Sequence, residues 1–257
     1  MLILLPPSEG KTAPRRGRPL DLGSLGSPGL TSTRHRVVDA LVAASGRPDA
    51  ADLLGVGHTQ LDLLERNRTL REAPTARADR VYTGVLYDAL GFDSLSPAAR
   101  RRATSRVGVT SSVFGLVRPG DRIPAYRLSG DATLPDLGPV AGMWRDVLGE
   151  AVTDALGGGL LVDLRSGTYA AFWRPPTALA RRVATVRVLH ESGGTHKVVS
   201  HFNKATKGRL VRALLEDGRN PRTPTELASV LRDLGWHVEA GPATTKGTQL
   251  DVVVSEV

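Results

Sequence analysis

Short apolar runs recur along this chain between segments of helical spacing, and this alternation constrains its fold more than any other feature. Residues 2–5 form the first run, and residues 107–109 and 160–163 form two more, the last of which ends in a carboxylate. Such runs are too short for helices and are typical of strands buried inside a sheet. Residues 33–44 instead repeat apolar side chains at the spacing of one helical face. The sequence therefore predicts a mixed α/β fold.

The last third of the chain contains a hairpin signal followed by a predicted pair of helices. Residues 183–190 and 197–202 are expected to form two strands joined by a glycine-containing turn. The helices are expected at residues 207–216 and 224–234, and the second begins with the signal of a capping box.

Nothing in the composition divides the chain into separate parts. No shift of composition marks a linker, and no internal repeat is visible, so we expect one unit that spans residues 1–257. The chain has no cysteine, and no apolar run approaches the roughly 18 residues of a membrane helix. The histidines lack the spacing of a metal site. We therefore expect a cytoplasmic protein without a membrane partner, a metal or a cofactor.

Positive charge is concentrated in two stretches of the chain. The net charge is +8, from 34 Lys and Arg against 26 Asp and Glu. Residues 100–127 carry a net +6 and residues 174–212 a net +8, which leaves −6 for the rest. This segregation favours an electropositive face or cleft for a polyanion or a phosphorylated ligand, on which we expect the two stretches to converge. The alternative is that these charges only solvate the surface.

Residues 9–12 (EGKT) follow the first predicted strand and are similar to the end of a phosphate-binding P-loop. The full motif needs a glycine where this chain has Leu5, so a Walker-type ATPase is excluded. Lys11 nevertheless lies just past the end of a strand, where it is well placed to meet an anion. Lys11 and its neighbour Thr12 are therefore candidate ligand-binding residues.

Residues 118–127 combine three arginines, an aspartate and a tyrosine with two prolines that stiffen the backbone. Rigid loops that present guanidinium groups suit the recognition of phosphate or carboxylate. A structural alternative is that an arginine pairs with Asp121 and fixes the loop. The candidate ligand-binding residues of this segment are Arg118, Arg122, Tyr126 and Arg127.

Asp163, Ser166 and Tyr169 follow the buried run that ends at residue 163. In α/β sheets, ligands collect at the carboxyl ends of strands. In an enzyme, Asp163 would serve as a general base, Ser166 as a hydrogen-bond donor and Tyr169 as a ring contact. A structural alternative is that Asp163 and Ser166 cap the helix that follows.

Lys204, Lys207 and Arg209 gather at the predicted start of the first helix of the pair. Lys204 and Lys207 are three residues apart and share a helical face. Positive charge at the start of a helix opposes the helix dipole unless an anion joins it. The three residues are therefore further candidates for binding a ligand.

Five blocks of sequence, in this order, resemble the YaaA (peroxide stress protein) family, and the likeness covers essentially the whole chain. The forms of these blocks look like the actinobacterial branch of the family. The blocks are residues 1–12 (MLILLPPSEGKT), 81–90 (VYTGVLYDAL), 111–128 (SSVFGLVRPGDRIPAYRL), 161–173 (LVDLRSGTYAAFW) and 200–208 (SHFNKATKG).

The resemblance implies an unusual α/β fold in a cytoplasmic protein that limits iron-dependent damage by hydrogen peroxide. It also implies DNA binding through a positively charged cleft and a helix-hairpin-helix element, which would be the helix pair at residues 207–234. Two departures from the family pattern stand out. Residues 217–222 carry one glycine where two are expected, and Asn203 and Ala205 stand where Ala and Lys are expected. By the resemblance, the cleft would be lined by Lys11, Arg118, Arg127, Lys204 and Lys207.

Two functions follow as expectations. The first is a DNA-binding protein of the peroxide stress response, which makes sequence-independent phosphate contacts. The alternative is an enzyme that acts on a nucleotide, a nucleobase or another anionic small molecule, and whether the protein is catalytic stays open. A deep pocket would favour the enzyme and an open groove would favour the DNA-binding protein. The candidate catalytic residues of the alternative are Lys11, Asp163, Tyr169 and Lys204.

Overall fold

A mixed β-sheet runs through the computed structural model, which describes residues 1–192, 195–197 and 200–255. Its strands are β1 (Leu2–Leu5), β3 (Val107–Ser111), β4 (Gly115–Val117), β8 (Leu161–Asp163), β9 (Val183–Ser192), β10 (Thr195–Lys197), β11 (His237–Thr244) and β12 (Gly247–Ser255). Among the described residues the order is β11–β12–β9–β8–β1–β3–β4, with β10 paired to β9. Two small two-stranded sheets lie apart from it and consist of β2 (Ala76–Arg77) with β5 (Arg122–Ile123) and β6 (Thr133–Leu134) with β7 (Gly138–Pro139).

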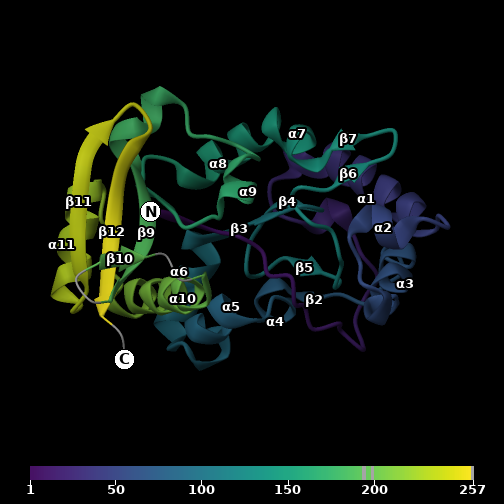
Figure 1. Cartoon of the computed structure of the whole chain (residues 1–257), viewed down its shortest axis with the longest axis horizontal. Coiled ribbons are helices and arrows are strands. Elements are labelled where there is room, and N and C mark those ends of the chain that lie inside the picture. The colour runs from purple at the N-terminus through teal and green to yellow at the C-terminus, as the bar shows by residue number, and fades with distance from the viewer. Residues whose placement is uncertain (193–194, 198–199, 256–257) are drawn as a thin grey trace.

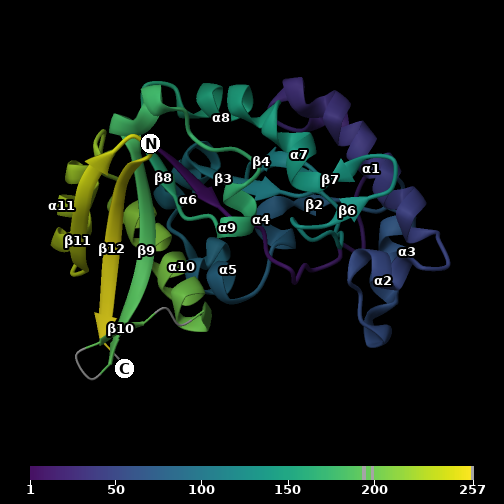
Figure 2. The same cartoon turned by 45° about the horizontal axis from the view of Figure 1, so that its top comes forward.

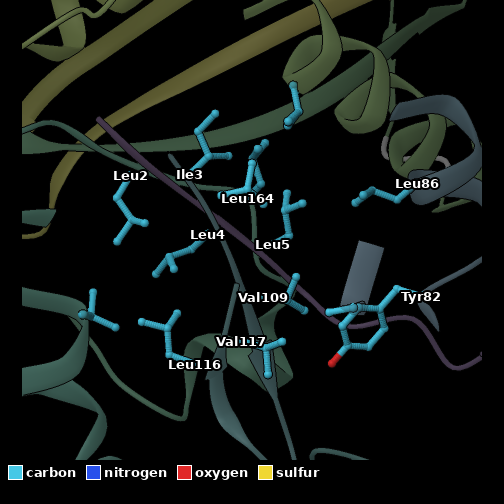
Figure 3. Close-up of a cluster of buried hydrophobic side chains, with 14 of the residues drawn as sticks. Leu2, Ile3, Leu4, Leu5, Tyr82, Leu86, Val109, Leu116, Val117 and Leu164 are labelled. Carbon is cyan, nitrogen blue, oxygen red and sulfur yellow. The ribbon is translucent and has the colours of Figure 1, made fainter. Parts of the chain in front are cut away.

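The centre of the sheet is parallel and its two edges are antiparallel. β12, β9, β8, β1 and β3 pair in parallel, whereas β11 and β4 pair antiparallel to their neighbours. β1 lies between β8 and β3, and its four side chains are fully buried. Figure 3 shows these side chains within a cluster that includes Val109, Leu116 and Leu164. Because the parallel strands run in one direction, their carboxyl ends meet at one edge of the sheet.

Helices cover both faces of the sheet, and none in the described part of the chain is long and apolar enough to cross a membrane. Figures 1 and 2 show α7 and α8 on one side and α5 and α10 on the other, with α1, α2 and α3 at the end of the molecule remote from β11. The helices are α1 (Thr31–Ser45), α2 (Ala50–Leu54), α3 (Asp62–Arg68), α4 (Ala78–Val81), α5 (Val85–Leu90), α6 (Pro97–Arg106), α7 (Val140–Arg145), α8 (Leu148–Leu156), α9 (Gly167–Ala170), α10 (Ser200–Asp217) and α11 (Pro224–Asp233).

The elements with strong local signals form as predicted. The mixed α/β class is confirmed, and the apolar runs at residues 2–5, 107–109 and 160–163 became β1, β3 and β8. α11 begins at the predicted position, where the Thr223 hydroxyl accepts a hydrogen bond from the backbone N–H of Glu226 at 3.2 Å.

The predicted second strand of the hairpin, at residues 197–202, is wrong. β10 pairs with β9 and ends at Lys197, and α10 has already begun at Ser200. Residues 193–194 and 198–199 of this prediction lie outside the described residues. The physical reason is helical spacing: Thr206, one residue before the predicted helix, is buried in line with Leu210 and Val211 of α10. Helical spacing therefore prevailed over the hairpin signal upstream of residue 207.

The predicted helix pair is present, but its two helices pack mainly on different elements. α10 packs on α5 and α6, whereas α11 packs on β11 and β12. Arg219, in the connection between them, forms ion pairs with Asp217 at 2.9 Å and with Asp233 at 2.6 Å. The connection is therefore fixed to the end of each helix.

Candidate functional site

A cavity of about 450 Å³ lies at the carboxyl ends of β1 and β8. Leu4 of β1 pairs with Asp163 of β8, so the loops that follow the two strands leave the sheet at the same edge. The cavity is lined by residues 6–11 after β1, by Ser166, Thr168 and Tyr169 after β8, by residues 83–87 at α5, by residues 127–129 and Asp131, and by Lys204 of α10.

The loop after β1 folds back so that Lys11 contacts its own turn. The Lys11 amine donates a hydrogen bond to the carbonyl of Ser8 at 2.6 Å. It also lies 4.2 Å from the ring centre of Tyr126, which is a favourable cation–π distance. The hydroxyl of Ser8 in turn accepts from the backbone N–H of Thr83 at 3.2 Å. The amine is thereby held at the wall of the cavity.

Burial changes the protonation of Lys11. Removal from water, together with the neighbouring charge of Arg127, lowers the pKa of Lys11 to about 7, and Glu9 opposes the shift. At neutral pH the amine therefore exchanges between its charged and neutral forms. A lysine in this state binds an anion as the ammonium ion and can accept a proton as the free amine.

Tyr126 contacts the Lys11 amine with its ring and does not line the cavity. Its hydroxyl lies 3.1 Å from that of Tyr82 and 2.8 Å from that of Ser111. Burial raises the pKa of Tyr126 and of Tyr82, so both hydroxyls stay neutral. Tyr126, predicted as a ligand contact, therefore acts through its ring on Lys11.

Arg127 brings a second cation to the cavity and is only weakly neutralised. Its backbone N–H and C=O both bond to the side chain of Asn67, at 2.9 and 2.7 Å. Its guanidinium lies 3.6 Å from the carboxylate of Glu9, which is largely exposed. Its buried Nε has no hydrogen-bond partner among the described residues. The backbone of Arg127 is thus fixed, while its guanidinium has only the exposed carboxylate of Glu9 as an ion-pair partner among the described residues.

Asp163 is occupied by an ion pair and does not line the cavity. Both of its carboxylate oxygens accept from the guanidinium of Arg165, at 2.9 and 2.7 Å. Arg165 also donates to the carbonyls of Tyr169 and Trp173, at 3.2 and 3.0 Å. The predicted role of Asp163 as a free general base is therefore not supported by its geometry. The pair instead fixes the path of the chain from β8 through α9.

Tyr169 and Ser166 reach the cavity from this fixed segment. The Tyr169 ring packs on Gly130, where an added Cβ would lie 2.9 Å from the ring. Burial raises the pKa of Tyr169 to about 12, so its hydroxyl is a neutral hydrogen-bond donor. Ser166 stands at the N-cap position of α9, but its side chain makes no capping hydrogen bond. The structural alternative, in which the side chains of Asp163 and Ser166 cap that helix, is therefore not observed.

Only Lys204 of the three basic candidates on α10 lines the cavity. Because α10 begins at Ser200, Lys204 and Lys207 are its fifth and eighth residues, and the prediction that they open the helix is wrong. Lys207 is half-buried and donates to the carbonyl of Leu164 at 3.0 Å. Arg209 is exposed and lies outside the cavity lining. The helix-dipole argument for an anion at these lysines is thereby removed.

Arg118, Arg122 and Thr12 lie away from the cavity. Arg118 donates to the carbonyl of Val107 at 3.1 Å, at the amino end of β3 and thus at the opposite edge of the sheet from Lys11. Arg122 donates to the carbonyl of Thr75 at 2.7 Å. Thr12 is exposed and is not among the lining residues.

Much of the positive charge of residues 100–127 is used to join segments of the chain. Arg102 donates to the carbonyl of Leu215 at 2.7 Å, and Arg106 to that of Arg219 at 2.9 Å, so both fasten α6 to the end of α10. Such contacts need a partner far along the sequence, which the charge count cannot reveal. The charge count therefore overstates the charge that is free for a ligand.

Sequence reasoning missed several lining residues. Glu9, Ser129, Asp131 and Thr168 all lie at the cavity. Thr83 and Gly84 line the cavity as well. Their place in the sequence block at residues 81–90 was the signal that could have identified them.

A larger hollow lies beside α6 and is a weaker candidate. It has a volume of about 590 Å³. Arg77 at its wall already pairs with Asp79 at 2.6 Å, and Arg80 and Arg101 are exposed. Its charges are thus neutralised or hydrated.

Comparisons with known proteins agree with the sequence resemblance. The model of the family described as peroxide stress protein YaaA matches residues 1–241. A UPF0246 protein of Streptomyces coelicolor is 50% identical over 262 residues, which cover 100% of both chains. A UPF0246 protein of Corynebacterium efficiens is 45% identical over 93% of this chain and 95% of its own. One from Corynebacterium glutamicum is 38% identical over 94% of this chain and 96% of its own. The chain therefore belongs to the peroxide stress protein YaaA family, whose actinobacterial members include these UPF0246 proteins.

Proposed function

We propose that this protein binds a ligand with a phosphate or a similar oxyanion in the cavity at Lys11, as part of the response to peroxide stress. The observation that carries the proposal is the juxtaposition of Lys11 and Arg127. The two cations act on each other, since Arg127 lowers the pKa of Lys11. Their carboxylate neighbour Glu9 is largely exposed and lies 3.6 Å from Arg127.

An oxyanion would relieve the repulsion between the two cations. Arg127 keeps its buried Nε without a partner in the described part of the chain, and an arginine fork is suited to two parallel hydrogen bonds with one oxyanion. Arg127 lines the cavity, so an oxyanion bound there can pair with its guanidinium.

The size and lining of the cavity suit a nucleotide-sized molecule. Its volume of about 450 Å³ falls within the range of roughly 300–1,000 Å³ that is usual for small-molecule sites. Apolar surface from Pro6, Pro7 and Leu86 lies in the same cavity as the polar side chains of Ser166 and Tyr169. A flat, partly apolar ring joined to an anionic group would use both kinds of surface.

DNA binding is the second candidate, and the net charge of +8 favours it. Lys204 and Arg209 are exposed on α10, where a phosphate backbone could reach them. In this case, affinity for duplex DNA would fall steeply as salt rises, with little preference for sequence. Fluorescence anisotropy at several salt concentrations tests this, and absence of binding at low salt would exclude it.

Calorimetric titration with adenosine 5′-monophosphate and with inorganic phosphate tests the leading proposal. We expect Arg127→Gln to weaken binding by roughly tenfold to a hundredfold, the contribution of a charge-assisted hydrogen bond. The matched control is Arg36→Gln, because Arg36 is exposed on α1 and lies outside the cavity lining. If the wild-type protein binds neither ligand at millimolar concentration, or if both variants behave alike, the proposal is wrong.

The role in peroxide stress has its own test. Cells that lack this protein are expected to be more sensitive to hydrogen peroxide, and the wild-type gene should restore survival. The Arg127→Gln gene should fail to restore it, whereas Arg36→Gln should succeed. Equal survival with and without the protein would contradict the role.

A further inference from the structure

The cations of the cavity come from two different parts of the fold. Lys11 and Arg127 belong to the loop after β1 and to the segment after β5, and the charge of Arg127 acts directly on Lys11. Lys204 reaches the same cavity from α10, which packs on α5 on one side of the sheet. The cavity therefore has two cationic positions, a coupled pair and a single lysine.

One face of α10 is fixed to its neighbours by residues spaced four apart, which lie in line on a helix. Arg212 donates to the carbonyls of Leu90 and Gly91 at the end of α5, at 3.1 and 3.2 Å. Glu216 accepts from the backbone N–H and the hydroxyl of Ser96 before α6, at 2.9 and 2.6 Å. The last two turns of this face are therefore held by hydrogen bonds.

Gly208 and Lys204 continue the same face toward the cavity. At Gly208 the two helices approach so closely that an added Cβ would lie 2.2 Å from the carbonyl oxygen of Leu86. Lys204 is one turn further along and is the member of this face that lines the cavity. It is exposed, and no hydrogen bond or ion pair with another described residue engages its amine. A rigid helix thus presents an unpaired ammonium group to the cavity.

We infer that the ligand carries two phosphate-type groups, one bound by Arg127 with Lys11 and the other by Lys204. This inference rests on the proposed function and narrows its ligand. A single oxyanion satisfies the coupled pair and leaves Lys204 unpaired. A second oxyanion on the same molecule pairs with Lys204, whose backbone α10 already holds at the wall of the cavity. A nucleoside bisphosphate carries this chemistry, and so does a short single strand of nucleic acid.

Calorimetric titration with matched ligands tests the inference. Adenosine 5′-monophosphate supplies one phosphate group, and adenosine 3′,5′-bisphosphate supplies two on the same nucleoside. We expect the bisphosphate to bind the wild-type protein roughly tenfold to a hundredfold more tightly than the monophosphate, because one further charge-assisted contact increases affinity by about this factor. A short oligothymidylate in a parallel titration distinguishes the two sources. Tighter binding of the strand than of the bisphosphate would assign the site to nucleic acid.

Lys204→Ala should remove this preference. In that variant the two adenosine ligands should bind within about threefold of each other, because affinity for the bisphosphate falls far more than affinity for the monophosphate. Lys246→Ala is the matched control, because Lys246 is exposed in the turn between β11 and β12. Equal affinities for the two ligands in the wild type, or equal loss of both in Lys204→Ala, would overturn the inference and leave the proposed function intact. Failure of the wild type to bind either ligand would instead remove the proposed function.

Discussion

Gly208 of α10 lies against the backbone carbonyl of Leu86 in α5, and a methyl group added at position 208 would be 2.2 Å from that oxygen. The added atom would also meet the Cβ of Ala89 at 2.9 Å. Leu86 lines the cavity, as does Lys204 one turn before Gly208. The distance between the two helices therefore sets the width of this part of the cavity.

We predict that Gly208→Ala destabilises the protein and weakens ligand binding together. The backbone atoms of α5 cannot move aside as a flexible side chain would, so α10 must shift, at a cost of about 1–3 kcal/mol. Urea unfolding with calorimetric titration measures both effects. The matched control is Gly142→Ala in α7, where an added Cβ meets nothing within 4 Å and helix propensity favours alanine. A neutral Gly208→Ala would show that the two helices are not held at this distance.

The ion pair between Asp163 and Arg165 leads to a second prediction. The Arg165 side chain is fully buried and that of Asp163 is 10% exposed. Replacement of Asp163 by Asn would leave a buried guanidinium without its counter-charge, which typically costs about 3–5 kcal/mol. We expect Asp163→Asn to lower the midpoint of urea unfolding accordingly.

An exposed pair provides the control for this substitution. Arg47 and Asp49 are 2.8 Å apart, and about half of each side chain is exposed. Asp49→Asn should change stability by about 0–1 kcal/mol. If Asp163→Asn were as mild as Asp49→Asn, the Asp163–Arg165 pair would not fix the chain after β8.

The lowered pKa of Lys11 gives the stability of the protein a definite dependence on pH. Below about pH 7, Lys11 is protonated in both the folded and the unfolded state. Between about pH 7 and 10.5, the unfolded lysine keeps its proton while the folded one loses it. Because the unfolded state then binds more protons, the contribution of Lys11 to stability rises with pH in this window.

Ligand binding should have the opposite dependence on pH. An anion favours the ammonium form, so affinity for adenosine 5′-monophosphate should fall by up to about tenfold per pH unit between about pH 7.5 and 9. The phosphate, with a pKa of about 6, is already doubly charged in this range. Lys11→Met should bind more weakly and with nearly constant affinity over the same range. Constant affinity in the wild type would show that Lys11 does not take up a proton with the ligand.

The sequence predicted those parts of the fold and site whose cause is local. The apolar run at residues 2–5 is stable only when it is removed from water, which predicts a buried strand. The polar residues after β1 and β8 lie close together because parallel strands end at the same edge of a sheet. Lys11, Arg127, Ser166, Tyr169 and Lys204 were predicted site residues that do line one cavity.

The remaining features depend on partners that a single sequence does not identify. Asp163 is engaged by Arg165 only two residues away, but the burial that makes this pair strong comes from the fold. Arg118 bonds to the carbonyl of Val107, and backbone carbonyls carry no signal in a sequence. β11 was not predicted because most of its side chains are exposed, so it lacks an alternating apolar pattern.

The final prediction separates the two lysines of α10. Lys207 is half-buried and donates to the carbonyl of Leu164 at 3.0 Å, so it joins α10 to the segment after β8. Burial lowers the pKa of Lys207, and the charge of Asp163 opposes this shift. Lys207→Ala should therefore lower the free energy of unfolding by about 1–2 kcal/mol, because it leaves a carbonyl without its donor. Lys204→Ala removes an exposed amine and should stay within about 0.5 kcal/mol of the wild type. Thermal unfolding of both variants, followed by titration with adenosine 3′,5′-bisphosphate, should show a stability defect in Lys207→Ala and a binding defect in Lys204→Ala. A larger loss of stability in Lys204→Ala than in Lys207→Ala would reverse the two roles.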